Sequence, residues 1–214
     1  MEEADFSKRF DISYSSAEGV FQPVDVADLD VTWNNLWAAV PPVARLLRAR
    51  FADRWVRFNA LPNAKRYATS DAERAEVLRR YHALLEPLID DVLTGAQGLV
   101  VVTCSWSSTP VPVERDRGVA TIVPEAVHWR SDNLATEPGF QSWQHHYVSR
   151  LTTAGLDRLL VFVANDLTDG VIVTNDICSW VLHPFDGGAE LFAGSSEDRD
   201  RLARAHADWL PSVS

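Results

Sequence analysis

The sequence predicts a single α+β domain, in which a mostly antiparallel or mixed β-sheet carries flanking helices. Two short apolar runs flank Asp186-Gly187-Gly188, and Asp-Gly or Gly-Gly in that position is a strong hairpin signal. The run Leu99–Trp106 is largely apolar at successive positions, as expected of a central strand covered on both faces. Capped amphipathic stretches predict the helices. The 214 residues contain no internal repeat and no clear linker, which favours one domain.

The first 30 residues are strongly acidic, unlike the basic segment 31–85. They hold eight acids and two bases and are weakly periodic. We therefore predict an acidic N-terminal arm over residues 1–30 and the single α+β domain over residues 31–214. Asp30 can cap the first helix, which Pro41-Pro42 must break or kink. The apolar face of this helix comprises Trp33, Leu36, Trp37 and Val40.

A strand and a long helix are predicted next. Arg54–Leu61 combines bulky residues with polar alternation, which favours a strand, and Pro62–Lys65 is a turn. Ser70 and Glu73 form a capping box at the start of the helix. Its buried face comprises Val77, Leu78, Tyr81, Leu84, Leu85 and Leu88.

The second half of the chain predicts short strands and two helices. Gly155–Ala164 is expected to be helical, and Ser195 or Ser196 caps a final helix with acids in its first turn. The predicted strands are Leu99–Trp106, Ala126–Trp129, Tyr147–Leu151, Val171–Thr174, Ile177–His183 and Ala189–Phe192.

Composition narrows the classes of function. The net charge of −10 disfavours nucleic acid and anionic membranes as partners, unless the basic segment 31–85 forms one face. No apolar run approaches the roughly 20 residues of a membrane helix, and the N-terminus lacks the features of a signal peptide. Cys104 and Cys178 lie in apolar runs and are expected to be buried free thiols. We therefore expect a cytoplasmic protein.

The sequence offers no catalytic or metal-binding signature. It has no nucleophile elbow, no phosphate-binding loop, no H-E-x-x-H and no C-x-x-C. His145 and His146 are adjacent on a predicted strand, so their side chains should point to opposite faces rather than to one ion. Cys104 follows three valines in a strand, where a thiol is inert packing. We expect no catalytic residues, no metal and no cofactor.

One group of basic residues is a candidate anion-binding site. Arg57, Lys65 and Arg66 bracket the Leu61-Pro62 turn. If Arg57 faces solvent, the three cations can converge on a carboxylate or phosphate, which suits the fork of donors on arginine. The alternative is a set of surface charges that pair with local acids and contribute little.

Two segments resemble an uncharacterised bacterial family of domains of unknown function. The first is Trp55–Tyr67, similar to the family pattern R-F-H-x-L-P-x-x-K-R-Y, and the second runs from Trp180 through the P-[YF]-D-G-G hairpin to a terminal W-L. The resemblance covers roughly residues 45–210, and departs from the family at Asn59, where His is expected, and at Pro211, where Ser is expected. It brings no known catalytic residues. Members look like small acidic proteins that accompany bacterial toxins, which implies an immunity protein.

Three functions remain open from the sequence. The first is a non-catalytic protein-binding domain, such as a bacterial immunity protein that neutralises a basic toxin; an acidic surface would speed that association. The second is a small-molecule or anion-binding enzyme that uses the region of Arg57, Lys65 and Arg66. The third is a structural or regulatory interaction module. A pocket that joins the basic residues to a histidine would favour the second.

Overall fold

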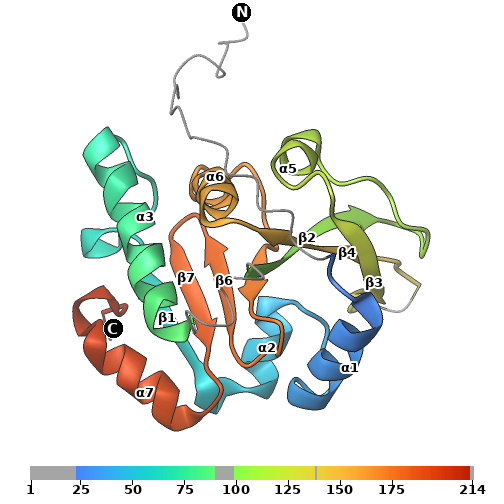
Figure 1. Cartoon of the computed structure of the whole chain (residues 1–214), viewed down its shortest axis with the longest axis horizontal. Coiled ribbons are helices and arrows are strands. Elements are labelled where there is room, and N and C mark those ends of the chain that lie inside the picture. Colours follow the sequence, from blue (N-terminus) through green and yellow to red (C-terminus); the bar gives the residue numbers. More distant parts are fainter. Residues whose placement is uncertain (1–22, 90–98, 138, 213–214) are drawn as a thin grey trace, which may run out of the picture.

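A single antiparallel sheet organises the molecule. The computed structural model describes residues 23–89, 99–137 and 139–212 (Figure 1). Within these residues the sheet has seven strands in the order β1-β7-β6-β5-β2-β4-β3, and every neighbouring pair is antiparallel. The strands are β1 (Trp55–Asn59), β2 (Leu99–Ser107), β3 (Val127–Asn133), β4 (Trp143–Leu151), β5 (Ile172–Thr174), β6 (Val181–Phe185) and β7 (Gly188–Phe192).

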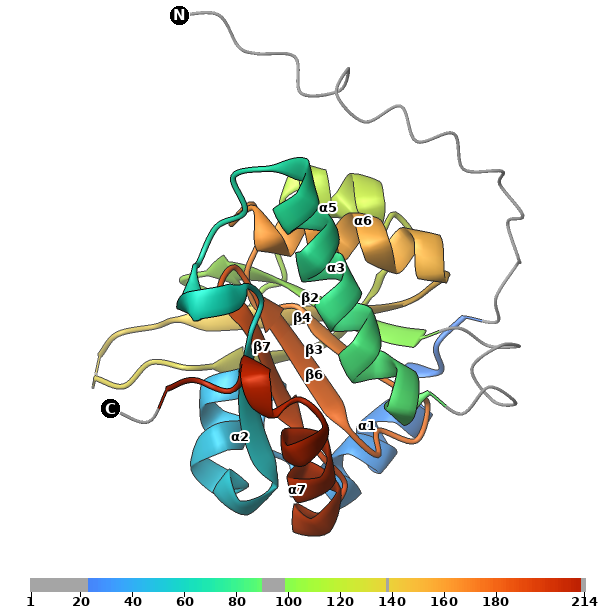
Figure 2. The ribbon, with the colours of Figure 1, turned by 90° about the vertical axis from the view of Figure 1, so that its left-hand side faces the viewer.

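Helices cover both faces of this sheet, which confirms the predicted α+β class. The α-helices are α1 (Val26–Leu36), α2 (Ala44–Arg50), α3 (Asp71–Leu85), α5 (Arg117–Ile122), α6 (Thr153–Ala164) and α7 (Ser196–Ala205). Single 3-10 turns are η2 (Ala52–Arg54), η3 (Pro62–Ala64), η4 (Glu86–Leu88) and η5 (Ala207–Trp209). Figure 2 shows α3 crossing in front of the sheet, with its upper half overlapping α6 and with α7 near the bottom of the view.

The apolar residues form two cores, one on each face of the sheet. The first core joins the sheet to α3, α6 and α7 through residues such as Tyr81, Leu160 and Leu202. The second joins it to α1 and α2 and contains Trp33 and Trp37. Strand β2 contributes Leu99 and Val101 to the first core and Val100 and Val102 to the second. Its nearly continuous apolar pattern is thus explained by burial on both sides, as the sequence predicts.

Local capping chemistry fixes the start of α3. The Ser70 hydroxyl accepts a hydrogen bond from the backbone N–H of Glu73 at 3.2 Å. The Glu73 carboxylate reaches back to the backbone N–H of Thr69 at 2.7 Å, one residue earlier than a standard capping box requires. The Ser70 hydroxyl thus satisfies one of the unpaired donors of the helix end, and the Glu73 carboxylate ties the residue before the N-cap to the first turn.

The first helix begins earlier than predicted. Asp25, rather than Asp30, is its N-cap, and its side chain accepts from the backbone N–H groups of Ala27 and Asp28. The boundary predicted between residues 30 and 31 falls inside α1, and Leu29, on its N-terminal side, packs in the second core. Residues 1–22 of the predicted acidic arm lie outside the described residues.

The strand predicted over Ile177–His183 also begins later than expected. The backbone of Cys178 is left-handed, with φ of 49°, and the Asn175 side chain accepts from the Ser179 N–H at 2.9 Å. This turn leads into β6 at Val181.

Cys178 is nevertheless buried, whereas Cys104 is only half-buried, and both thiols are free. No helix among the described ranges has the length and apolarity needed to cross a membrane.

Candidate functional site

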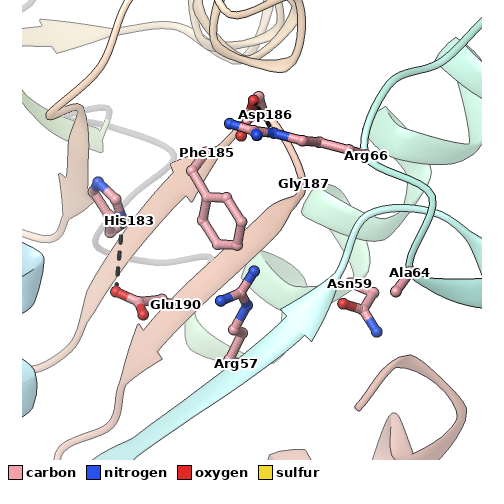
Figure 3. Close-up of a pocket in the computed structure, with 9 residues that line it drawn as sticks. All are labelled: Arg57, Asn59, Ala64, Arg66, His183, Phe185, Asp186, Gly187 and Glu190. Carbon is pink, nitrogen blue, oxygen red and sulfur yellow. Dashed lines mark hydrogen bonds and ion pairs between the residues drawn. The ribbon is translucent and has the colours of Figure 1, made fainter. Parts of the chain in front are cut away.

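A cleft opens beside the β6–β7 hairpin, on the face of the sheet that carries α2. It has a volume of about 440 Å³. Figure 3 shows its walls, which come from β1, β6, β7, the turn between the last two strands, and the segment after β1. The lining residues are Arg57, Asn59, Ala64, Arg66, His183, Phe185, Asp186, Gly187 and Glu190.

A tyrosine hydroxyl of α3 and a close backbone approach to β1 hold the hairpin in place. Asp186 and Gly187 form the two-residue turn of the predicted hairpin, and Gly188 is the first residue of β7. The Tyr81 hydroxyl of α3 lies 2.9 Å from the Phe185 carbonyl oxygen and 3.1 Å from that of Gly188, so its single proton is shared between two acceptors. At position 188 the backbone approaches β1 so closely that a side chain has no room.

Arg57 places a guanidinium at the cleft that no carboxylate of the described residues pairs with. Its neighbours Val56 and Phe58 enter the first core, so strand alternation turns Arg57 to the opposite face, where it is exposed. The guanidinium carbon lies 4.7 Å from the centre of the Phe185 ring, and Figure 3 shows the two side chains facing each other. No carboxylate among the described residues pairs with it. A guanidinium supported on an aromatic ring keeps its donor fork available for a planar anion.

The structure brings Arg57 and Arg66 to this cleft but not Lys65. Arg66 Nε lies 2.5 Å from Asp186 Oδ2, an ion pair that joins the segment after β1 to the hairpin turn. Lys65 Nζ instead lies 2.6 Å from Glu73 Oε1, at the start of α3. Of the three predicted cations, Arg57 lies at the cleft without an ion-pair partner among the described residues, Arg66 lies there paired with Asp186, and Lys65 lies elsewhere.

His183 and Glu190 lie opposite each other on β6 and β7 and are absent from the sequence-based candidate site. The buried Glu190 carboxylate is paired with Arg48 of α2 at 2.9 Å, and its second oxygen lies 3.9 Å from His183 Nδ1. The other ring nitrogen of His183 is 3.9 Å from Asp169 Oδ1. These two distances exceed a direct hydrogen bond. Burial lowers the pKa of His183, so the ring is neutral at pH 7 and its Nδ1 has no hydrogen-bond partner among the described residues.

The length of the hairpin turn is the sequence feature that could have placed His183 opposite Glu190. A two-residue turn at Asp186-Gly187 places residue 183 opposite residue 190 in the hairpin register. Both side chains therefore lie on the same face of the sheet as Arg57, the Cα partner of Glu190 on β1. The sequence alone does not reveal that β1 pairs with β7.

The chemistry of the cleft suits recognition. Its lining has no serine, threonine, cysteine, lysine or tyrosine, and its two carboxylates, Asp186 and Glu190, are paired with Arg66 and Arg48. What it offers is the Arg57 fork, the Asn59 side chain, one available ring nitrogen of His183 and the buried Glu190 carboxylate. The Arg57 fork and the Asn59 amide can orient an anionic group by donating hydrogen bonds, whereas the Glu190 carboxylate only accepts them and is paired with Arg48.

His145 and His146 of β4 contact side chains of the neighbouring strands. His145 and His146 point to opposite faces of β4: His145 lies 2.8 Å from Ser107 Oγ and 2.7 Å from Ser131 Oγ, and His146 is buried on the other side with Nε2 3.5 Å from Asp132. Across the described ranges, no group of three or more His, Cys, Asp or Glu side chains is placed to hold a metal ion.

Comparison with known proteins identifies a family and no function. The family described as Domain of unknown function (DUF3885) matches residues 43–214, which include every residue that lines the cleft. No curated protein and no solved structure matches the chain.

Proposed function

We propose that this chain, which belongs to the DUF3885 family of domains of unknown function, is a protein-binding domain that receives an acidic group of its partner in the Arg57 cleft. The observation that supports this most is the exposed guanidinium of Arg57, which rests on Phe185 at 4.7 Å with no carboxylate partner in the described parts of the chain. A carboxylate placed over it would complete a bidentate pair.

The residues around the cleft are of the types that anchor protein interfaces. Arginine and aromatic side chains contribute most of the binding energy in protein complexes, and they do so from preformed, well-packed positions. Here Arg66 adjoins the half-exposed Tyr67 ring at 5.3 Å, and Asp186 fixes Arg66 in place. The rim of the cleft is therefore preorganised, which lowers the entropy cost of association.

The most concrete form of this proposal is a bacterial immunity protein that acts in the cytoplasm and neutralises a toxin. The net charge of −10 supports a basic partner, because long-range attraction between opposite charges accelerates encounter. The Arg57 cleft would then set the register of the complex by accepting one acidic side chain of that partner. Steering depends on the total charge, whereas register depends on the local pair, so the two roles are compatible.

Affinity capture with matched variants tests this function. The tagged chain, Arg57→Ala and Arg158→Ala are used to capture proteins from the native host, and each captured protein is quantified by mass spectrometry. Arg158 is an exposed arginine of α6 that does not line the cleft, so its variant controls for the loss of one positive charge. We expect Arg57→Ala to weaken one partner about thirtyfold, equivalent to about 2 kcal/mol for an interface anchor, while Arg158→Ala retains it. Equal recovery with all three proteins would refute the proposal.

A second candidate function is an enzyme that acts on a small anion. The observation that favours it is that the cleft joins Arg57 and Arg66 to His183, with Glu190 near enough to orient the ring through one water. In this case Arg57 would hold the anion and His183 would transfer a proton. A folded His183→Gln variant separates the two functions: excess protein restores biological activity if the chain binds a partner, whereas excess fails to restore it if His183 is a proton-transfer residue.

A further inference from the structure

We propose a second ligand site on the opposite face of the sheet, where Arg115 binds a carboxylate that is attached to an apolar group. This site lies over β2 and β4, at the far end of the sheet order from the Arg57 cleft. It involves neither the hairpin nor β1, so the inference stands independently of the proposed function.

The segment after β2 is fastened to the sheet at one carbonyl group. The backbone oxygen of Val113 accepts a hydrogen bond from the Ser105 hydroxyl at 2.7 Å and another from the Tyr147 hydroxyl at 2.6 Å. Ser105 belongs to β2 and Tyr147 to β4, so two strands hold the same peptide group. This fixes the chain two residues before Arg115 and directs that side chain onto the sheet.

Arg115 is a half-buried cation that lacks a counter-charge. Its guanidinium lies 5.4 Å from the centre of the Tyr147 ring, and Nη1 donates to Thr103 Oγ1 at 3.3 Å. No carboxylate in the described parts of the chain pairs with it. Burial without such a partner lowers the pKa of Arg115. Removing water from a cation is unfavourable unless an anion or several hydrogen bonds replace the water. The neutral partners Thr103 and Tyr147 leave most of its five donors unused.

The surroundings of Arg115 define the class of ligand. The cleft at this point has a volume of about 640 Å³, within the range of small-molecule sites. Apolar atoms of Pro112, Val113, Ala120 and Ala126 line it together with Tyr147, Glu114, Arg115 and Arg117. One half-buried guanidinium matches one bidentate carboxylate, and the apolar wall suits the remainder of such a molecule. Glu114 and Arg117 of the same cleft offset each other, which leaves the single positive charge of Arg115, a better match for a carboxylate than for a phosphate dianion.

NMR titration of the full chain with benzoate tests this site. We expect saturable shift changes that centre on residues 112–120 and Tyr147, and at least tenfold weaker binding of benzamide, which has the same ring and no charge. Inorganic phosphate should also bind at least tenfold more weakly. Absence of saturable shifts with benzoate, equal binding of benzamide, or tighter binding of phosphate would each overturn the inference.

Two variants locate the cation. Arg115→Gln should weaken benzoate at least tenfold, whereas Arg158→Ala, which changes the net charge equally, should leave it unchanged. If Arg115→Gln does not fold, Arg115→Lys keeps the charge and removes the planar fork, and we expect it to weaken benzoate at least threefold. A folded Arg115 variant that binds benzoate as tightly as the parent would contradict the site.

Discussion

Replacing Gly188 by alanine tests how the β6–β7 hairpin is seated against β1. A Cβ atom on this residue would lie 2.0 Å from the carbonyl oxygen of Phe58, a distance that real Cβ atoms essentially never show. Phe58 and Asn59 pair with Ala189 and Gly188, so the obstructing carbonyl belongs to the β1–β7 pairing itself. It cannot rotate away as a side chain would, and the two strands must separate locally.

The loss of folding stability depends on whether the added Cβ atom clashes with backbone or with a side chain. Overpacking a well-packed site costs about 1–3 kcal/mol, and a rigid backbone obstacle places Gly188→Ala at the upper end, about 3 kcal/mol. For a chain of this length, 1 kcal/mol corresponds to about 2–4 °C, so the thermal midpoint should fall by about 6–12 °C. At Gly187 the nearest atom is Phe185 Cε2 at 3.2 Å, which a small ring rotation relieves. Gly187→Ala should therefore cost less than about 1 kcal/mol.

Urea unfolding followed by tryptophan fluorescence measures both variants. The comparison between adjacent glycines controls for the general effect of adding a methyl group to this turn. A Gly188→Ala variant within about 0.5 kcal/mol of the parent, or a Gly187→Ala variant that is the more destabilised of the two, would show that β1 does not obstruct residue 188.

Three further predictions concern other parts of the fold. The hydrogen bond to Asp157 raises the pKa of His82, so this pair stabilises the fold below the ordinary histidine pKa, and the stabilisation is lost as pH rises through the raised value. Because His82 is half-exposed, this stabilisation is below about 1 kcal/mol. Urea unfolding at pH 5.5 and 8.5 should show the pH-dependent stabilisation in the parent and its loss in His82→Gln. Burial raises the pKa of Cys104 to about 11 and of Cys178 to about 12, so a thiol reagent at pH 7.5 should label both at least tenfold more slowly than in urea, and labelling of either at its unfolded rate would contradict this placement. Tyr81→Phe removes the shared hydrogen bond to the hairpin and should cost about 1 kcal/mol in urea unfolding, whereas no loss would show that this hydroxyl does not stabilise the hairpin.

The parts of the fold that the sequence predicts well are those set by local chemistry. Ser70 caps α3, a two-residue turn at Asp186-Gly187 joins β6 to β7, and the pattern of β2 predicts a central strand. Each depends on residues close together in the chain, so propensity and periodicity are sufficient to find them. The predicted start of α1 is wrong because two acids near its N-terminus, Asp25 and Asp30, are both suitable caps and only the packing of Leu29 distinguishes them.

The candidate site is predictable only in part because it depends on contacts between distant segments. Arg57 meets Phe185 only because β1 pairs with β7, about 130 residues later in the chain. Lys65 and Arg66 diverge after Asn63 and Ala64, whose backbones are left-handed with φ of 57° and 54°. Alanine rarely adopts that conformation, so no sequence pattern predicts the change of direction.

The most direct test of the central claim is a charge exchange across the interface. With the captured partner in hand, binding affinity is measured for the parent and Arg57→Glu, each against the native partner and against a partner in which the contacted carboxylate is replaced by lysine. We predict that Arg57→Glu weakens the native complex at least a hundredfold and that the exchanged pair recovers at least tenfold, which is about 1.4 kcal/mol or more. Strict additivity of the two changes, for every carboxylate on the partner's interface, would contradict the claim that Arg57 receives an acidic group.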